Sequence, residues 1–207
     1  MLRLVGLLVA VGVLGGCVTT GSSTDGGPVP VARLQAENRA IVIAHTSMHD
    51  GCLSLIATLA RPNESGQFEV ARTVVLKHTL AFNKQVPATF EVPAGEYGFI
   101  RFECQTGNHR STFHARVAKQ GSLFNGPRTT YVPIATFTVQ PGEVVDIGSL
   151  RLPTRQVGQA SLFQMPKNVF TPVITPIPDD WLQKLAEAEP ALYQARIVRP
   201  MTRATQI

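Results

Sequence analysis

The sequence predicts a mainly β fold, a two-layer antiparallel β-sandwich followed by a short C-terminal α-helical segment. Three observations predict it: eight short segments rich in β-branched and aromatic residues, turn residues between them, and no helical periodicity among them. The chain has 207 residues, of which 44% are apolar and 16% charged. This composition excludes a long disordered chain and a coiled coil, so one ordinary domain with tails fits the length.

Residues 1–16 have the layout of a secretory signal peptide. Arg3 provides the positive charge near the start, and an apolar run follows over residues 4–14. This run is shorter than the roughly 20 apolar residues that span a bilayer. We therefore expect a signal that is removed and not a transmembrane helix.

The segment ends in Leu14-Gly15-Gly16-Cys17, which resembles the lipobox of bacterial lipoproteins. The resemblance implies that Cys17 receives a diacylglyceryl thioether, that residues 1–16 are cut away, and that the new amine is acylated. Several acyl chains hold a protein stably at a membrane, whereas one chain is marginal. The residue after Cys17 is Val18. In lipoproteins of Gram-negative bacteria, an Asp at this position would favour the inner membrane. The resemblance thus favours the outer membrane with the domain facing the periplasm; the alternative is a plain cleaved signal.

Residues 17–39 are expected to form a lipidated flexible tether, because residues 18–31 are rich in Gly, Ser, Thr and Pro. The formal net charge of the whole chain is +5, and the basic residues are scattered. We therefore predict no nucleic-acid partner. The expected partners are the membrane, through the lipid anchor, and an envelope protein. The sequence identifies no small-molecule ligand.

The β-sandwich domain is expected over residues 40–155. Its strands are predicted at residues 40–47, 52–60, 69–77, 87–92, 97–104, 112–118, 133–139 and 144–152. Apolar and polar positions alternate in several of them, which is typical of strands with one wet face. In the last strand Val145 and Ile147 share one parity and Leu150 has the other, which predicts a bulge near Gly148.

Two stretches with Pro-Gly turns have a family likeness. Residues 88–97 read ATFEVPAGEY, and residues 137–152 read FTVQPGEVVDIGSLRL. Both are similar to the turns of transthyretin-like (carboxypeptidase regulatory-like) β-sandwiches and to repeats in small uncharacterised proteobacterial lipoproteins. The resemblance implies a binding or structural module, and it transfers no catalytic residue to this chain.

The C-terminal part is predicted as a Pro-rich extended linker over residues 156–178 and a helical segment over residues 179–200. Asp180 is the expected N-cap, with Gln183 as its capping-box partner. One apolar helix face is formed by Trp181, Leu185 and Ala188. We expect this face to pack on the chain's own domain; the alternative is a partner protein.

Cys52 and Cys104 remain once Cys17 is lipidated, and the periplasm is oxidising. A bridge between them closes a loop of about fifty residues, which is worth about 4 kcal/mol in the chain-entropy model. The alternation of strand positions argues against this bridge, because Cys104 lies on the apolar face of its predicted strand, whereas Cys52 falls opposite Leu53 and Leu55. Strand ends can turn over, so we predict the disulfide, with two separate thiols as the alternative.

The five histidines do not predict a metal site. His45 and His49 precede Asp50, but four residues of a strand span roughly 13 Å, and zinc ligands lie about 2 Å from the ion. His109 and His114 fall on opposite faces of a strand. There is no Gly-x-Ser-x-Gly or Cys-x-x-Cys motif. We expect no cofactor, no metal and no enzymatic activity; a metal-dependent envelope hydrolase is the weak alternative.

The loop of residues 121–131, GSLFNGPRTTY, is the candidate recognition surface, because loops on a rigid scaffold often carry binding. Its candidate residues are Phe124, Asn125, Arg128 and Tyr131. The leading hypothesis is a non-enzymatic outer-membrane lipoprotein with a structural or binding role. A glycan or cell-wall ligand-binding module is the main alternative. That alternative requires an exposed aromatic platform built from Tyr97, Phe99, Phe124 and Tyr131.

Overall fold

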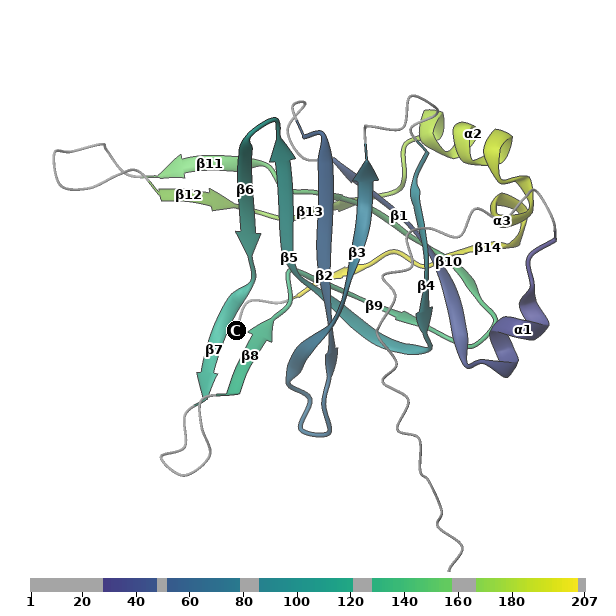
Figure 1. The fold of residues 1–207 in the computed structure, drawn as a ribbon, viewed down its shortest axis with the longest axis horizontal. Coiled ribbons are helices and arrows are strands. Elements are labelled where there is room, and N and C mark those ends of the chain that lie inside the picture. The colour runs from purple at the N-terminus through teal and green to yellow at the C-terminus, as the bar shows by residue number, and fades with distance from the viewer. Residues whose placement is uncertain (1–27, 48–51, 79–85, 121–127, 158–166, 205–207) are drawn as a thin grey trace, which may run out of the picture.

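A computed structural model describes residues 28–47, 52–78, 86–120, 128–157 and 167–204. The fold is mainly β, with sheets curled into a sandwich and a few short helices (Figure 1). This confirms the predicted fold class. A strand lies in each of the eight predicted segments, and a break at Ala115 divides one of those segments into two strands.

The first sheet has five strands in the order β13-β10-β1-β4, with β14 also paired to β10. Its strands are β1 (Arg39–Ser47), β4 (Ala88–Pro93), β10 (Val144–Arg151), β13 (Val173–Thr175) and β14 (Arg196–Val198). The pairs β1–β10 and β10–β14 are parallel, and the others are antiparallel. The sheet is therefore mixed rather than wholly antiparallel, because most of the second sheet intervenes between β1 and β10 and serves as their crossover.

The second sheet has eight strands in the order β15-β9-β5-β2-β3-β8-β7, with β6 also paired to β5. Its strands are β2 (Ser54–Pro62), β3 (Phe68–His78), β5 (Gly95–Thr106), β6 (His109–His114), β7 (Arg116–Gln120), β8 (Arg128–Val132), β9 (Ala135–Val139) and β15 (Thr202–Arg203). All its pairings are antiparallel. A separate hairpin, β11 (Thr154–Val157) with β12 (Lys167–Phe170), extends away from the sandwich in Figure 1.

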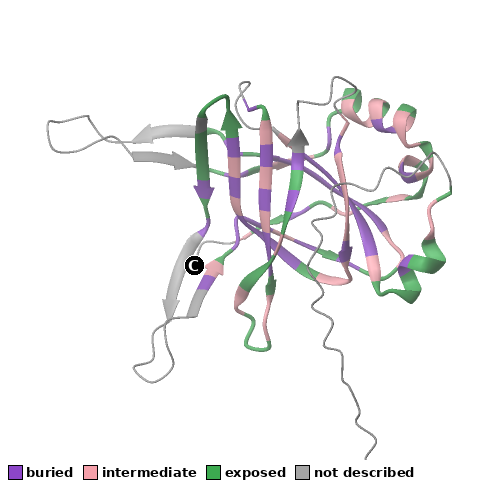
Figure 2. Cartoon of the chain, viewed as in Figure 1, coloured by how far each residue is buried: buried purple, intermediate pink, exposed green. Residues whose placement is uncertain are grey.

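The main core lies between the two sheets. On β2 the buried residues are Leu55, Ala57, Leu59 and Ala60, and on β9 they are Ala135, Phe137 and Val139. Buried positions alternate with intermediate or exposed ones along most of β2 (Figure 2) and along β9. Phe99 and Phe102 are both fully buried, and their ring centroids are 5.2 Å apart. Each such side chain contributes about 1.5–3 kcal/mol of apolar burial.

A second core covers the other face of the five-stranded sheet. Helices α1 (Val31–Ala36), α2 (Asp179–Ala188) and α3 (Pro190–Ala195) contribute Leu34, Leu185 and Leu192, which pack with Ile41, Ile43 and Val144 of the sheet. This helical layer explains why residues 40–44 are apolar on both parities, since both faces of β1 are covered. It confirms that the apolar face of the C-terminal helix packs on its own domain.

Several predicted boundaries need correction. The last part of the expected tether forms α1, because Leu34 is fully buried against the sheet. The expected linker contains β13, and Arg196–Val198 is a strand rather than helix. Asp180 is not the N-cap of α2: Pro178 occupies that position without a side-chain cap. Asp179 and Asp180 lie in the first turn, where carboxylates interact favourably with the helix dipole.

The bulge near Gly148 is confirmed. The β1–β10 register shifts between Ile43 and His45, and Gly148 has φ of +85°. A Cβ at this position would lie 2.8 Å from the carbonyl oxygen of Thr175, so only glycine fits without strain. The turn at Pro141-Gly142 has type II character, with φ of +83° at Gly142 and a hydrogen bond from the N–H of Glu143 to the carbonyl of Gln140.

Residues 196–203 connect the two sheets. Strand β14 pairs with β10 of the five-stranded sheet, and β15 pairs with β9 of the eight-stranded sheet. Between them, the main-chain N–H groups of Arg199 and Met201 donate to the carbonyls of Asp146 and Ile147. Residues 196–203 are thus an integral part of the sandwich.

Candidate functional site

The predicted recognition loop is only partly within the described residues. Phe124 and Asn125 lie outside them. Arg128 opens β8, where its main chain pairs with Gln120. Tyr131 is half-buried and packs against the main core, opposite Val117. Of the four candidate side chains, the structure describes only that of Tyr131, which packs partly on the core. The recognition surface at this loop therefore stays a prediction.

The aromatic platform needed by the glycan-binding alternative is not formed by its first two members. Tyr97 is 1% exposed and Phe99 is fully buried, because both lie on the inward parity of β5. Their rings contact Phe137 in the core. These two residues cannot stack on a sugar.

A disulfide joins Cys52 to Cys104, with a Cα–Cα distance of 5.6 Å. The parity conflict disappears because Cys52 precedes β2, which begins at Ser54, so strand alternation does not fix its direction. Both cysteines are buried, and Cys104 lies opposite Leu55. Neither can act as an exposed nucleophile or metal ligand. Cys17 lies outside the described residues.

His45 forms a buried contact that resembles a nucleophile–base pair. Its Nδ1 is 2.8 Å from Oγ of Ser149, and its ring centroid is 4.6 Å from that of Trp181. Because Ser149 is only 1% exposed, a substrate carbonyl cannot reach the hydroxyl. The contact fastens α2, which carries Trp181, to strands β1 and β10. Among the described residues no group of three or more His, Cys, Asp or Glu side chains could hold a metal, and His49 and Asp50 lie outside that part of the chain.

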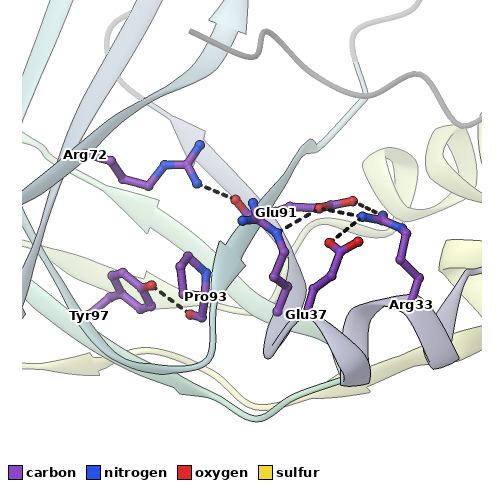
Figure 3. Close-up of polar contacts among 7 residues, drawn as sticks. Arg33, Glu37, Arg72, Glu91, Pro93 and Tyr97 are labelled. Atoms are coloured by element: carbon purple, nitrogen blue, oxygen red, sulfur yellow. Dashed lines mark hydrogen bonds and ion pairs between the residues drawn. The ribbon is translucent and has the colours of Figure 1, made fainter. Parts of the chain in front are cut away.

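The most developed polar site lies around Glu91 on strand β4 (Figure 3). Glu91 accepts hydrogen bonds from both terminal nitrogens of Arg33 on α1 and from Nε of Arg39 on β1, the last at 3.1 Å. Arg33 also pairs with Glu37 at 3.0 Å. Glu91 thus connects the helical layer to the sheet edge, and Figure 3 shows Arg33 and Arg72 approaching β4 from opposite sides.

Three side chains of the eight-stranded sheet donate to main-chain carbonyls at the end of β4. Arg72 Nη1 donates to the carbonyl of Glu91 at 2.6 Å, and the Tyr97 hydroxyl donates to that of Pro93 at 2.7 Å. Arg61 Nη2 donates to the carbonyl of Ala94 at 3.0 Å. Strand β4 is an edge strand in the described sheet, so these donors satisfy acceptors that a neighbouring strand would otherwise pair with.

We call Arg33, Arg39, Arg61 and Arg72 the arginine cluster. Of these four arginines, Arg33 and Arg39 form ion pairs with carboxylates. In the described part of the chain, Arg61 and Arg72 have no carboxylate within ion-pair distance. Arg61 instead lies over the ring of Tyr97, with 5.2 Å from Cζ to the ring centroid. Gly95 leaves the room for this approach, since a Cβ there would meet the Arg61 guanidinium.

The cluster perturbs its own titratable groups. Burial of Glu91 opposes its ionisation, but hydrogen bonds and charges from Arg33 and Arg39 outweigh that effect and lower the pKa of Glu91. Burial, and then the charge of Arg39, lower the pKa of Arg72. Burial raises the pKa of Tyr97 against the charges of Arg61, Arg72 and Arg39. The charges that act on the Tyr97 hydroxyl are all positive, but burial outweighs them.

Sequence reasoning missed this site because its members come from separate elements. Arg33, Arg39, Arg61 and Arg72 lie on α1, β1, β2 and β3, so no spacing motif connects them. The alternation of β4 correctly directs Glu91 away from the main core. Pro93, which has no N–H for a sheet ladder, is the one signal that marks β4 as an edge strand.

Comparison with models of protein families, with curated proteins and with solved structures finds no match to this chain. No helix within the described ranges is long and apolar enough to cross a membrane. The fold and site define a class of molecule, a disulfide-linked β-sandwich with one helix-covered face and an arginine-rich edge. Its function has to be argued from its own residues.

Proposed function

We propose that the chain is an outer-membrane lipoprotein whose sandwich faces the periplasm as a non-enzymatic structural or binding module. The observation that carries the proposal is the sequence Leu14-Gly15-Gly16-Cys17 at the end of an apolar run with Arg3 near its start. A large apolar residue, two small ones and a cysteine at the end of this run resemble the lipobox, and that resemblance implies lipidation and cleavage. Cys17 is the proposed point of attachment.

The disulfide supports an oxidising compartment. Disulfides persist in the periplasm and outside cells, and they are rare in the reducing cytosol. The Cys52–Cys104 bridge closes a sequence separation of 52 residues in a domain with an extensive core of its own. A structural bridge of this kind fits a secreted domain that has to survive without repair.

The tether fits the same proposal. Residues 18–30 lie between Cys17 and the first helix and include three Gly and two Pro residues. A flexible coil of this length spans about 20 Å, so an anchor at Cys17 would hold the sandwich close to the membrane surface. An envelope protein would then be captured by the sandwich or its hairpins, and crosslinking in cells followed by mass spectrometry would identify it.

Metabolic labelling with a palmitate analogue tests the anchor. The wild-type protein should take up the label, and Cys17→Ser should lose it. Cys104→Ser is the matched control, because it removes a cysteine from the disulfide and should keep the label. Absence of label from the wild type would remove the anchor, and label on Cys17→Ser would move it to another residue.

The non-enzymatic part of the proposal rests on the buried Ser149–His45 contact. The most suggestive catalytic pair among the described residues has no access to substrate, and the disulfide occupies both described cysteines. The test is an activity screen of the purified protein with ester, amide and glycoside substrates. Turnover that survives in Ser149→Ala and His45→Ala would reveal a site elsewhere, and turnover lost in both would contradict the structural role assigned here.

A further inference from the structure

We propose that the arginine cluster binds the phosphate groups of anionic phospholipids, so that the β4 end of the sandwich rests on the membrane surface. The choice of a membrane rests on the proposed lipid anchor. The site itself rests on the four arginines and their surroundings, and it adds a second, non-covalent contact to the one that Cys17 would provide.

The first argument is charge. The cluster holds four guanidinium groups and two carboxylates, those of Glu37 and Glu91, and both carboxylates are already bound by Arg33 and Arg39. Arg61 and Arg72 each donate through one nitrogen to a main-chain carbonyl. A carbonyl carries only a partial negative charge, so among the described residues Arg61 and Arg72 have no ion-pair partner within 4 Å, and the four guanidinium groups exceed these two carboxylates by two charges.

The second argument is geometry. Arg72, the Tyr97 hydroxyl and Arg61 donate to the main-chain carbonyls of Glu91, Pro93 and Ala94, so both guanidinium groups lie at the same end of β4. The carbonyl contacts and the Tyr97 ring hold Arg61 and Arg72 in position before any ligand arrives. A planar guanidinium offers paired donors that match the oxygens of a phosphate group. An incoming phosphate therefore finds donors that need little reordering.

The third argument is placement. Arg33 lies on α1, the first element after the tether, so the cluster is at the part of the fold nearest in sequence to Cys17. Only residues 18–30 separate Cys17 from α1, so an anchor at Cys17 would keep α1 within about 45 Å of the bilayer even with this segment fully extended. Arg61 is exposed and Arg72 is half-buried, so both can reach a headgroup. An anionic lipid surface attracts each nearby arginine with a further free-energy gain.

Vesicle binding by the Cys17→Ser chain, which cannot be lipidated, tests the proposal. Partition onto vesicles of phosphatidylglycerol and phosphatidylcholine is compared with partition onto phosphatidylcholine alone. The double variant Arg61→Gln/Arg72→Gln should bind the anionic vesicles about thirtyfold more weakly, since each arginine near such a surface is worth about a fivefold change. Any apolar segment left on the chain would bind both kinds of vesicle, so the difference between them is the readout.

The matched control is Arg151→Gln/Arg203→Gln, which removes the same charge from exposed residues away from the cluster. Arg151 is the last residue of β10, and Arg203 lies on β15 opposite Ala135, the first residue of β9. It should bind like the parent chain; an equal loss would show a net-charge effect and overturn the site. Unchanged binding by the cluster variant would also overturn it. Circular dichroism checks the fold, and Arg61→Gln alone, at an exposed position, replaces the double variant if that one unfolds.

Two further outcomes separate this proposal from the anchor. Inorganic phosphate that is bound by the cluster, without binding to anionic vesicles, would assign the site to a soluble phosphate and overturn the membrane contact. Palmitate labelling that fails while vesicle binding depends on Arg61 and Arg72 would remove the anchor and leave the cluster. Palmitate labelling that succeeds, together with vesicle binding that does not depend on Arg61 and Arg72, would leave the anchor and remove the cluster as a lipid site.

Discussion

Arg72 of β3 donates a hydrogen bond of 2.6 Å to the main-chain carbonyl of Glu91 on β4, and this contact joins the two sheets of the sandwich at their edge. The donor comes from the eight-stranded sheet and the acceptor from the five-stranded one. Arg33 and Arg39 bind the carboxylate of the same glutamate. One residue of an edge strand thus connects both sheets and the helical layer.

Replacement of Arg72 should destabilise the sandwich. Arg72→Ala leaves the Glu91 carbonyl without its partner and removes packing by the arginine stem, so we expect a loss of about 1–3 kcal/mol. Urea denaturation followed by circular dichroism measures it. Arg72→Lys keeps a donor and should lose less, and an unchanged midpoint for Arg72→Ala would show that the contact contributes nothing.

The helical layer should be part of the cooperative fold. Leu185 of α2 is fully buried in the second core, and truncation of such a residue leaves a cavity. Leu185→Ala should cost about 2–5 kcal/mol. The neighbouring Gln183→Ala, at an exposed position on the same helix, is the control and should have little effect. Equal stability of both variants would mean that α2 is not docked.

Loss of the disulfide should be among the largest single effects. A loop with a sequence separation of 52 corresponds to about 4 kcal/mol of chain entropy. The double variant Cys52→Ser/Cys104→Ser should therefore unfold at much lower denaturant, and reduction of the wild type should bring it to the same midpoint. A reductant that leaves the midpoint of the wild type unchanged would contradict the bridge.

Acid should weaken the contact between Glu143 and Arg199. Two hydrogen bonds of 2.8 Å from Arg199 lower the pKa of Glu143 below its ordinary value of 4.5. A carboxyl whose folded pKa is depressed stabilises the fold above the unfolded pKa, and this contribution is lost as pH falls through the folded pKa. Glu143→Gln should be less stable at neutral pH and show a shallower loss of stability below about 4.5.

Asp146 should have the opposite effect on the pH dependence of folding stability. Burial raises its pKa above the ordinary 3.8 against a hydrogen bond from the N–H of Gly148. Its ionisation in the folded state is therefore unfavourable, so its share of stability falls as pH rises through 3.8 and through the folded pKa. Asp146→Asn should remove that decline. Equal pH profiles for Glu143→Gln and Asp146→Asn would contradict both assignments.

The strands could be predicted because β-branched residues and alternation report local burial, as on β9, where Ala135, Phe137 and Val139 are inward. The Gly148 bulge followed from a change of parity within one strand. The parallel β1–β10 pair could not be predicted, since partner choice depends on contacts about a hundred residues apart. Helix α1 was missed because a short helix is stabilised by one buried leucine, Leu34, and not by propensity.

The candidate site was harder to predict than the fold. Cys52 and Cys104 were identified from cysteine number and compartment, although strand parity argued against the pair. The arginine cluster depends on the sheet order, which brings β2 and β3 against β4. Tyr97 and Phe99 are candidates for a surface platform because aromatic side chains occur both in cores and on binding surfaces. Their position on the inward-facing side of β5 is what buries them.

The most direct test of the central claim is the mass of the N-terminal peptide of the protein purified from its native membrane. A lipoprotein should begin at Cys17 and carry the mass of a diacylglyceryl group and an amide-linked acyl chain on that residue. A peptide that begins at Met1, or an unmodified Cys17, would contradict the account.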